Sequence, residues 1–267
     1  MIHPTAIIHP GAQLGPGCSV GPYSVIDEHV VLGAECAVGP QVYLTGHTLI
    51  GPGNRFHAGC VIGDAPQDLK YANAPTRLRI GEHNTFREHV TVHRSNKLEE
   101  DTVIGDGNLF MAGSHVGHNC HLGNHNILAN GALLGGHVHL ADRAFISGNC
   151  LVHQFCRVGR LALMQGGSAI SLDLPPFCVA RGDNGLAGLN TIGLRRAGIT
   201  SEQRLELRRA YHRLFRSELR RAQVLTEARS EFAPGSPAAE LVEFVATTKR
   251  GWCPDTGRRR SDPEEAS

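Results

Sequence analysis

Several of the sixteen histidines in this chain are spaced so that they could act together. His118, Gly136 and Gln154 follow one another at intervals of eighteen residues, and His137 and His153 lie beside that series. A histidine can take a proton from a hydroxyl or an amine. The N–H of a neighbouring glycine can face a developing oxyanion. These residue types suit acyl transfer, provided that the fold brings them together.

The element that must position them is a six-residue repeat. Large apolar residues recur at every sixth position from Ile2 to Ile170, and only Asp68 and Ala74 break the series. Neither the helix period of 3.6 nor the strand period of 2 gives a strict six. A short strand followed by a turn does, and its repetition builds a parallel β-helix of about ten triangular coils. Because three units complete a coil, residues eighteen apart stack, which gathers the series of His118 on one side.

Two other positions of the repeat are regular. Four residues after each apolar position the side chain is usually small, and six of the eight cysteines fall in this column. We therefore expect buried free thiols rather than disulfides or metal ligands. Glycine often follows the apolar residue, as in Leu14-Gly15, and we expect it to supply the positive φ of a tight corner.

The repeat is interrupted twice and then ends. The loop-like segments 63–77 and 93–101 are expected to leave the β-helix as excursions, and long loops on a rigid scaffold commonly carry function. We assign 1–189 to the β-helix, 190–250 to a small α-helical C-terminal domain and 251–267 to a disordered tail.

The helical region carries start signals and an excess of positive charge. Thr200 and Gln203 predict a capping box, and Ser236-Pro237 predicts a second helix start. Residues 195–229 include ten Arg and only four Glu. This imbalance predicts either a solvated helical face or a docking surface for an acidic partner or a phosphate, with Arg208, Arg209 and Arg213 as the residues to test.

A zinc site competes for the same histidines. His115, His118, His121 and His125 resemble the ligands of β-helical carbonic anhydrases, where zinc binds three histidines and keeps an open position. Against this, His121 and His125 occupy other slots of the repeat than His118, and the residues stacked on His121 are a His and then an Arg. A zinc hydratase and a scaffold whose histidines only cap corners both stay open.

Charge and hydropathy exclude other classes. The net charge of +1 gives no bias toward nucleic acid. No run approaches the roughly 20 apolar residues of a membrane span, and the N-terminus lacks the basic and apolar regions of a signal peptide. The expected compartment is the cytoplasm.

A resemblance to one family rests on the repeat and on seven segments: QDLKYANAPTR (67–77), TVHR (91–94), SHVGHNC (114–120), GGHV (135–138), VHQFC (152–156), DLPPF (173–177) and GLRRAG (193–198). They are similar to those of the UDP-N-acetylglucosamine O-acyltransferases. The resemblance implies a left-handed β-helix and a homotrimer with sites between neighbouring subunits. It implies transfer of a 3-hydroxyacyl chain from acyl carrier protein to the 3-position of UDP-N-acetylglucosamine, the first step of lipid A biosynthesis, without cofactor or metal.

The same resemblance implies residue roles. His118 is the general base and Gly136 the oxyanion donor, while three further histidines position the substrates: His115, His137 and His153. The sugar nucleotide and its phosphates are contacted by Asp68, Lys70, Gln154, Asn190 and Arg196. A glycine matching Gly166 accompanies long acyl chains, and this residue is expected on the coils above the His118 column.

Three residues depart from the family pattern. Asn119 stands where Asp is common, so a carboxylate that tunes the base is in doubt. Ile192 replaces a common Glu and Ala197 a common Arg, which concerns recognition of the nucleotide. Whether the acceptor is a 3-hydroxyl or a 3-amino sugar, and how long the acyl chain is, stay open.

Overall fold

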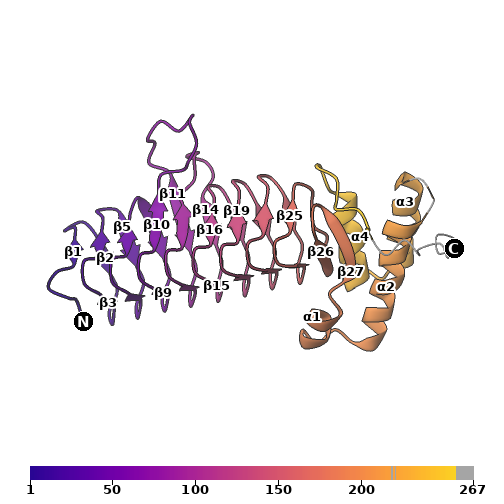
Figure 1. The fold of residues 1–267 in the computed structure, drawn as a ribbon, viewed down its shortest axis with the longest axis horizontal. Coiled ribbons are helices and arrows are strands. Elements are labelled where there is room, and N and C mark those ends of the chain that lie inside the picture. Colours follow the sequence, from indigo (N-terminus) through magenta and orange to yellow (C-terminus); the bar gives the residue numbers. More distant parts are fainter. Residues whose placement is uncertain (218, 220, 257–267) are drawn as a thin grey trace, which may run out of the picture.

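The computed structural model describes residues 1–217, 219 and 221–256. The N-terminal part is a parallel β-helix, and a group of helices closes its C-terminal end (Figure 1). The predicted fold class, a mainly β chain with a β-helix followed by a small helical part, is confirmed.

Three sheets form the faces of the β-helix. Sheet 1 contains β1 (Ile7–Ile8), β4 (Val25–Ile26), β7 (Tyr43–Leu44), β10 (Val61–Asp64), β13 (Thr91–His93), β16 (His115–Val116), β19 (Leu133–Leu134), β22 (Leu151–Val152) and β25 (Ala169–Ile170). Sheet 2 contains β2 (Gln13–Leu14), β5 (Val30–Leu32), β8 (His47–Ile50), β11 (Arg77–Ile80), β14 (Thr102–Ile104), β17 (His121–Leu122), β20 (His139–Leu140) and β23 (Arg157–Val158). Sheet 3 contains β3 (Ser19–Val20), β6 (Ala37–Val38), β9 (Arg55–Phe56), β12 (Thr85–Phe86), β15 (Leu109–Phe110), β18 (Ile127–Leu128), β21 (Phe145–Ile146), β24 (Leu163–Met164), β26 (Cys178–Arg181) and the antiparallel β27 (Gly185–Leu189).

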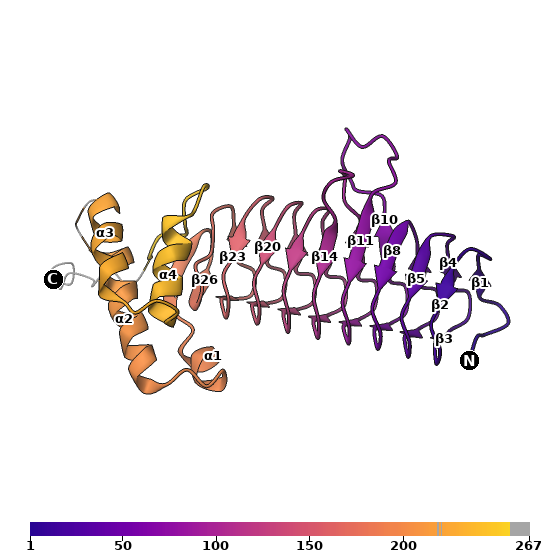
Figure 2. The ribbon, with the colours of Figure 1, turned by 180° about the vertical axis from the view of Figure 1, so that it is seen from behind.

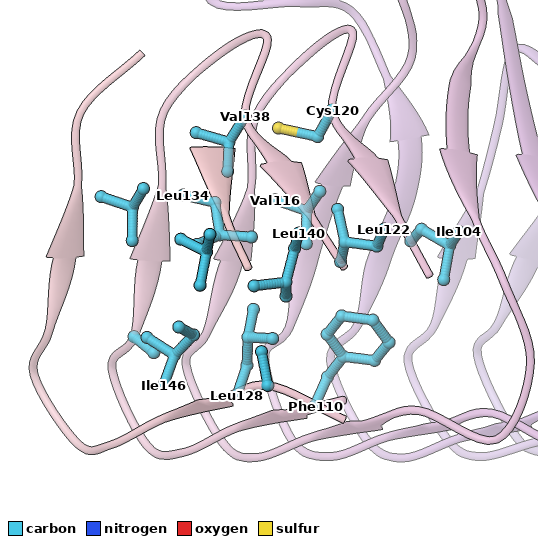
Figure 3. Close-up of a cluster of buried hydrophobic side chains, with 14 of the residues drawn as sticks. Ile104, Phe110, Val116, Cys120, Leu122, Leu128, Leu134, Val138, Leu140 and Ile146 are labelled. Carbon is cyan, nitrogen blue, oxygen red and sulfur yellow. The ribbon is translucent and has the colours of Figure 1, made fainter. Parts of the chain in front are cut away.

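The core is a column of apolar side chains from all three sheets (Figure 3). Val116 of β16 stacks on Leu134 of β19, and the inward residues of sheets 2 and 3 meet them across the interior. Because successive residues of a strand point to opposite faces, the neighbours of these residues point outward. His115 and Leu133 therefore lie on the outer face of sheet 1.

The glycines that follow the apolar position have another role than expected. Gly15 does not have a positive φ; a Cβ there would lie 2.6 Å from the Ala34 backbone N of the next coil. The left-handed conformation falls two residues later, at Gly17 and at the matching Tyr23. The predicted reason for the glycine was wrong, since close approach of stacked corners and not backbone twist requires it.

The lengths of the two excursions explain why apolar residues stay at every sixth position on both sides of them. Val61 pairs with Thr91 and Thr91 with His115, so these coils span thirty and twenty-four residues instead of eighteen. Both differences are multiples of six, which explains why the count survives although loop residues leave the coil. The first excursion projects beyond β10 and β11 (Figures 1 and 2).

Four helices follow: α1 (Thr191–Arg196), α2 (Ser201–Arg216), α3 (Arg221–Glu231) and α4 (Pro237–Ala246). The capping box is confirmed, since the Thr200 side chain accepts from the Gln203 N–H and the Gln203 side chain accepts from the Thr200 N–H. The start of α4 is confirmed too, with Ser236 as N-cap and Pro237 as the first residue. No helix in the described ranges is long and apolar enough to cross a membrane.

The C-terminal segment corrects one expectation. Residues 251–256 are not a disordered tail: the Cys253 N–H donates to the Asp173 carbonyl, and the Thr256 N–H donates to the Leu186 carbonyl. Cys253 is buried there, because the segment pairs with the end of the β-helix. The rest of the predicted tail, 257–267, lies outside the described residues. All eight cysteines are buried and free, as predicted.

Candidate active site on sheet 1

A groove of about 610 Å³ runs along the outer face of sheet 1 and its corner with sheet 2. The sequence prediction placed five of its lining residues together, and they do meet there: His115, His118, Gly136, His153 and Gln154. His137, which was predicted to join them, lines an adjoining groove on the side of sheet 2 instead. The groove also contains residues that sequence reasoning missed: Gln67, His93, Leu133, Leu151, Asp183 and Asn184.

The imidazole of His118 lies directly against Gly136. A Cβ at Gly136 would lie 2.7 Å from both Cε1 and Nε2 of the ring. Any side chain at Gly136 would therefore displace His118 or be displaced by it. This contact is the predicted stacking of the two residues on adjacent coils, and it brings the Cε1–Nε2 edge of the ring against Gly136.

The repeat leaves the Gly136 N–H free for a ligand. Within the described chain this N–H donates no hydrogen bond, whereas the next residue, His137, donates its N–H to the His118 carbonyl at 2.8 Å. Proline, which has no N–H, fills the same repeat position in early corners, at Pro4, Pro10, Pro16, Pro22, Pro40 and Pro52. The fold thus supplies a free backbone donor beside a histidine.

His115, on the strand that leads into the corner of His118, is held neutral. Its Nδ1 lies 2.7 Å from the Thr91 hydroxyl, and its ring meets the buried His93 edge-on at 4.8 Å. Burial, and then the neighbouring His93 and His118, lower the pKa of His115 to about 4. Burial lowers the pKa of the neighbouring His93 as well.

We expect this low pKa to make stability depend on pH. Between pH 6.5 and 4 the unfolded chain takes up a proton at His115 that the folded chain refuses, so acidification through this range destabilises the fold. His115→Asn keeps a polar atom toward Thr91 and cannot be protonated. Its urea midpoint should fall less than that of the wild type between pH 6.5 and 4. Equal losses in both proteins would contradict the assignment.

His137 closes the site on the side of sheet 2. Its ring meets His118 edge-on at 5.2 Å and stacks on Phe155 at 4.5 Å. Burial, and then His118, lower the pKa of His137. A ring held by stacking is suited to a positioning role.

The second excursion supplies partners of Asn119, the residue that contacts His118, and no pattern predicted them. His118 Nδ1 lies 2.9 Å from Oδ1 of Asn119. Asn119 is buried, and its Nδ2 donates to Ser95 Oγ at 2.7 Å and to Glu100 Oε2 at 3.0 Å. The only signals in the sequence were the TVHR segment and the loop composition, and neither indicates which loop residue turns inward.

The first excursion lies over the same site. The Asp68 carboxylate accepts from Asn96 Nδ2 at 2.8 Å, which ties the two excursions together. The Lys70 N–H and Asn96, with a smaller contribution from His118, lower the pKa of Asp68. Lys70 is exposed on the same turn. A carboxylate thus stands near His118, and an ammonium lies on the same turn as this carboxylate.

Asn190 and Arg196 are not brought to this groove. Both line a separate groove of about 670 Å³ on the outer face of sheet 3. Asn190 also caps α1, since its Oδ1 accepts from the Gly193 N–H and its Nδ2 donates to the Leu161 carbonyl at 2.9 Å. In one chain, therefore, these two residues lie apart from His118.

Gly166 is not placed above the His118 column, so that expectation was wrong. It lies at the corner between β24 and β25, on the opposite edge of sheet 1 from His118, and its nearest contact from a neighbouring coil is with Gly148. A Cβ there would lie 3.6 Å from the Gly148 carbonyl oxygen, in ordinary contact. Residues eighteen apart stack because they occupy the same corner of successive coils. Gly166 lies in a different corner from His118, so this spacing does not relate the two residues.

Comparisons with known proteins show to which family the chain belongs. A model described as "Udp N-acetylglucosamine O-acyltransferase; Domain 2" matches residues 173–253, and one described as "Bacterial transferase hexapeptide (six repeats)" matches residues 101–136. An acyl-[acyl-carrier-protein]–UDP-N-acetylglucosamine O-acyltransferase of Herminiimonas arsenicoxydans is 43% identical over 94% of this chain and 98% of its own. This chain belongs to the UDP-N-acetylglucosamine O-acyltransferase family.

Solved structures support the assignment to this family. A UDP-N-acetylglucosamine acyltransferase of Bacteroides fragilis superimposes with a TM-score of 0.89 at 38% identity, covering 94% of this chain and 99% of that one. The corresponding enzyme of Campylobacter jejuni gives 0.88 at 32% identity, covering 95% and 99%. Both likenesses extend through the helices as well as the β-helix.

Membership of the acyltransferase family leaves little support for the zinc interpretation. His115 lies on β16, His118 in the next corner, His121 on β17 and His125 in the corner after that. Instead of converging, His121 stacks on His139 at 5.0 Å. Among the residues that the structure describes, no three His, Cys, Asp or Glu side chains are grouped to hold a metal.

The three arginines chosen for docking differ in their surroundings. Arg208 and Arg209 are exposed on α2. Arg213 instead forms ion pairs with Glu227 at 2.9 Å and Glu231 at 3.8 Å, which join α2 to α3. Charge reversal at Arg213 would disturb the helical domain, so only the other two suit a test of partner binding in this family member.

Proposed function

We propose that this chain transfers a 3-hydroxyacyl group from acyl carrier protein to the 3-position of UDP-N-acetylglucosamine, the first step of lipid A biosynthesis, in the cytoplasm. One observation carries the proposal beyond family membership. The imidazole of His118 lies against Gly136, whose N–H is free within the described chain. A base and an oxyanion donor are the two groups that attack on a thioester needs.

The reaction follows from these positions. His118 Nε2 takes the proton of the sugar hydroxyl, and the oxygen forms a bond to the thioester carbonyl carbon. The oxyanion of the tetrahedral intermediate accepts a hydrogen bond from the Gly136 N–H. Collapse breaks the carbon–sulfur bond, and His118 returns its proton to the departing thiolate. His115, His137 and His153 surround the base and position the substrates, with Asp68, Lys70 and Gln154 toward the sugar nucleotide.

The outer face of sheet 1 offers a surface for the acyl chain. Leu133, Leu151 and Ala169 stack on successive coils beyond His115 and line the same groove as the base. Leu133 and Leu151 are 40% and 49% exposed, respectively. Apolar side chains left open to solvent beside a reactive site suit a ligand that covers them. Gly166 stands at the far edge of this surface.

A homotrimer is part of the proposal. Asn190 and Arg196 are proposed to bind the nucleotide, and in one chain they line a different face from His118. A site that contains both sets requires a second copy of the chain, which places a neighbour's sheet 3 beside sheet 1. Sedimentation at assay concentrations should give three times the mass of one chain.

The decisive assay uses the purified protein with acyl carrier protein loaded with 3-hydroxyacyl chains of varied length. The acceptors are UDP-N-acetylglucosamine and its 3-amino analogue. Product that carries the acyl group at the 3-position is expected, and the preferred acceptor decides between ester and amide formation. Absence of product with both acceptors and every chain length would overturn the proposal.

We expect carrier-protein binding to depend on Arg208 and Arg209. Reversing both to Glu removes positive charge from an exposed helical face, and steered association weakens when charge is lost or salt is raised. KM for the acyl carrier should rise about tenfold at low salt, and the difference from the wild type should shrink at high salt. Gln13→Glu, which adds a negative charge at an exposed position of β2 on sheet 2, is the control. An unchanged KM in the double variant would place the docking surface elsewhere.

A further inference from the structure

The network behind His118 fixes the orientation of one amide. The Asn96 N–H donates to Asn119 Oδ1 at 3.0 Å, and a backbone N–H can only donate. On the other side, Asn119 Nδ2 donates to Glu100 Oε2, and a carboxylate can only accept. Turning the amide over would place two donors together and an oxygen against a carboxylate. Asn119 Oδ1 must therefore face His118.

That orientation decides the tautomer of the imidazole. An amide oxygen accepts, so His118 Nδ1 must carry the hydrogen in the 2.9 Å contact with Asn119. The lone pair is then left on Nε2, which lies with Cε1 on the ring edge nearest to Gly136. A base in the other tautomer would present an N–H to the acceptor hydroxyl and could not take its proton.

Glu100 is held as a carboxylate at the end of this chain of hydrogen bonds. Lys97 Nζ lies 3.1 Å from its Oε1, and His137 Nδ1 lies 3.8 Å from its Oε2. The hydrogen bond from Lys97, followed by that from Asn119, lowers the pKa of Glu100. An Asp at position 119 would place a negative charge next to His118. Here Glu100 supplies that charge, and Asn119 lies between it and the imidazole.

We propose that Glu100 is a positioning residue of this acyltransferase. Through the Asn119 amide it holds His118 in the Nδ1–H tautomer and stabilises the imidazolium that forms when Nε2 takes the acceptor proton. No proton moves along the network, since Nδ1 keeps its hydrogen throughout. The inference rests on the proposed function, and it adds a residue of the second excursion to the site.

The test compares four variants in the transfer assay. In Glu100→Gln the new amide can donate or accept, so Asn119 is free to turn; kcat should fall about tenfold while both KM values stay within twofold. Asn119→Asp alone sets two carboxylates against each other and should also lose activity. In the double variant the new amide at position 100 can donate to the new carboxylate at position 119, which accepts directly from His118. There kcat should return to within about threefold of the wild type. Glu99→Gln, an exposed neighbour in the same loop, should not change kcat.

Rescue separates this role from a merely structural one. If Glu100 only braced the loop, the double variant would be no better than its worse parent, and that result overturns the inference. Wild-type kcat in Glu100→Gln overturns it too. Nitrogen-15 spectra of the histidines, with His118→Asn for assignment, give a readout without catalysis. His118 found mainly as the Nε2–H tautomer rejects the inference, whereas the expected tautomer in a protein that transfers no acyl group rejects only the proposed function.

Discussion

Replacing His118 by Ala should reduce kcat by roughly 10²–10⁴-fold, the usual loss when a general base is removed. The His118 ring supplies the three atoms nearest to a Cβ at Gly136, so the proposed base lies beside the N–H that we expect to meet the oxyanion. Residual activity should come from the Gly136 N–H and from substrate positioning. Steady-state kinetics with saturating acyl carrier and sugar nucleotide measure the loss.

The fold should survive this change. His118 lies in a corner and is only partly buried, while the column below it is formed by inward residues such as Val116 and Leu134. The unfolding midpoint of the variant should therefore stay close to that of the wild type. His121→Ala is the matched control, because His121 is exposed on β17 and belongs to the zinc interpretation alone. Full activity in His118→Ala, or equal losses in both variants, would contradict the mechanism.

The sequence predicted the column of the site because a strict period fixes what stacks on what. His118, Gly136 and Gln154 stand eighteen residues apart, and this spacing sets their neighbours without any knowledge of side-chain conformation. The same count does not relate different corners. It therefore misplaced Gly166, which lies in the column of Gly148.

The parts without a period could not be predicted. Which of the loop residues of 93–101 turn toward His118 depends on how the chain returns to β14, and so Ser95 and Glu100 were missed. Likewise, composition alone suggested a disordered tail, whereas burial of Cys253 depends on the end of the β-helix that it meets. The pairing of Arg213 with Glu227 also depends on how α2 and α3 pack.

Gly166→Met should shift the preferred acyl chain to shorter lengths by several carbons. A chain that starts beside His118 and crosses the outer face of sheet 1 passes Leu133 and Leu151 before it reaches the corner of Gly166. A glycine leaves that corner open, and among the described residues a Cβ there would meet only the Gly148 carbonyl oxygen, at 3.6 Å. The variant should therefore fold, with the Met side chain extending into the path of the chain.

The size of the shift follows from the burial of the alkyl tail. Each buried CH₂ contributes about 0.8 kcal/mol, so excluding four of them costs about 3 kcal/mol, or roughly 200-fold in kcat/KM for the longest substrates. Short acyl chains should be used at the wild-type rate, which serves as the internal control. Competition between short and long acyl carriers in one reaction measures the ratio directly. An unchanged ratio would place the limit on chain length in a neighbouring subunit, since Met164, the large apolar residue two positions before Gly166, is fully buried in the core.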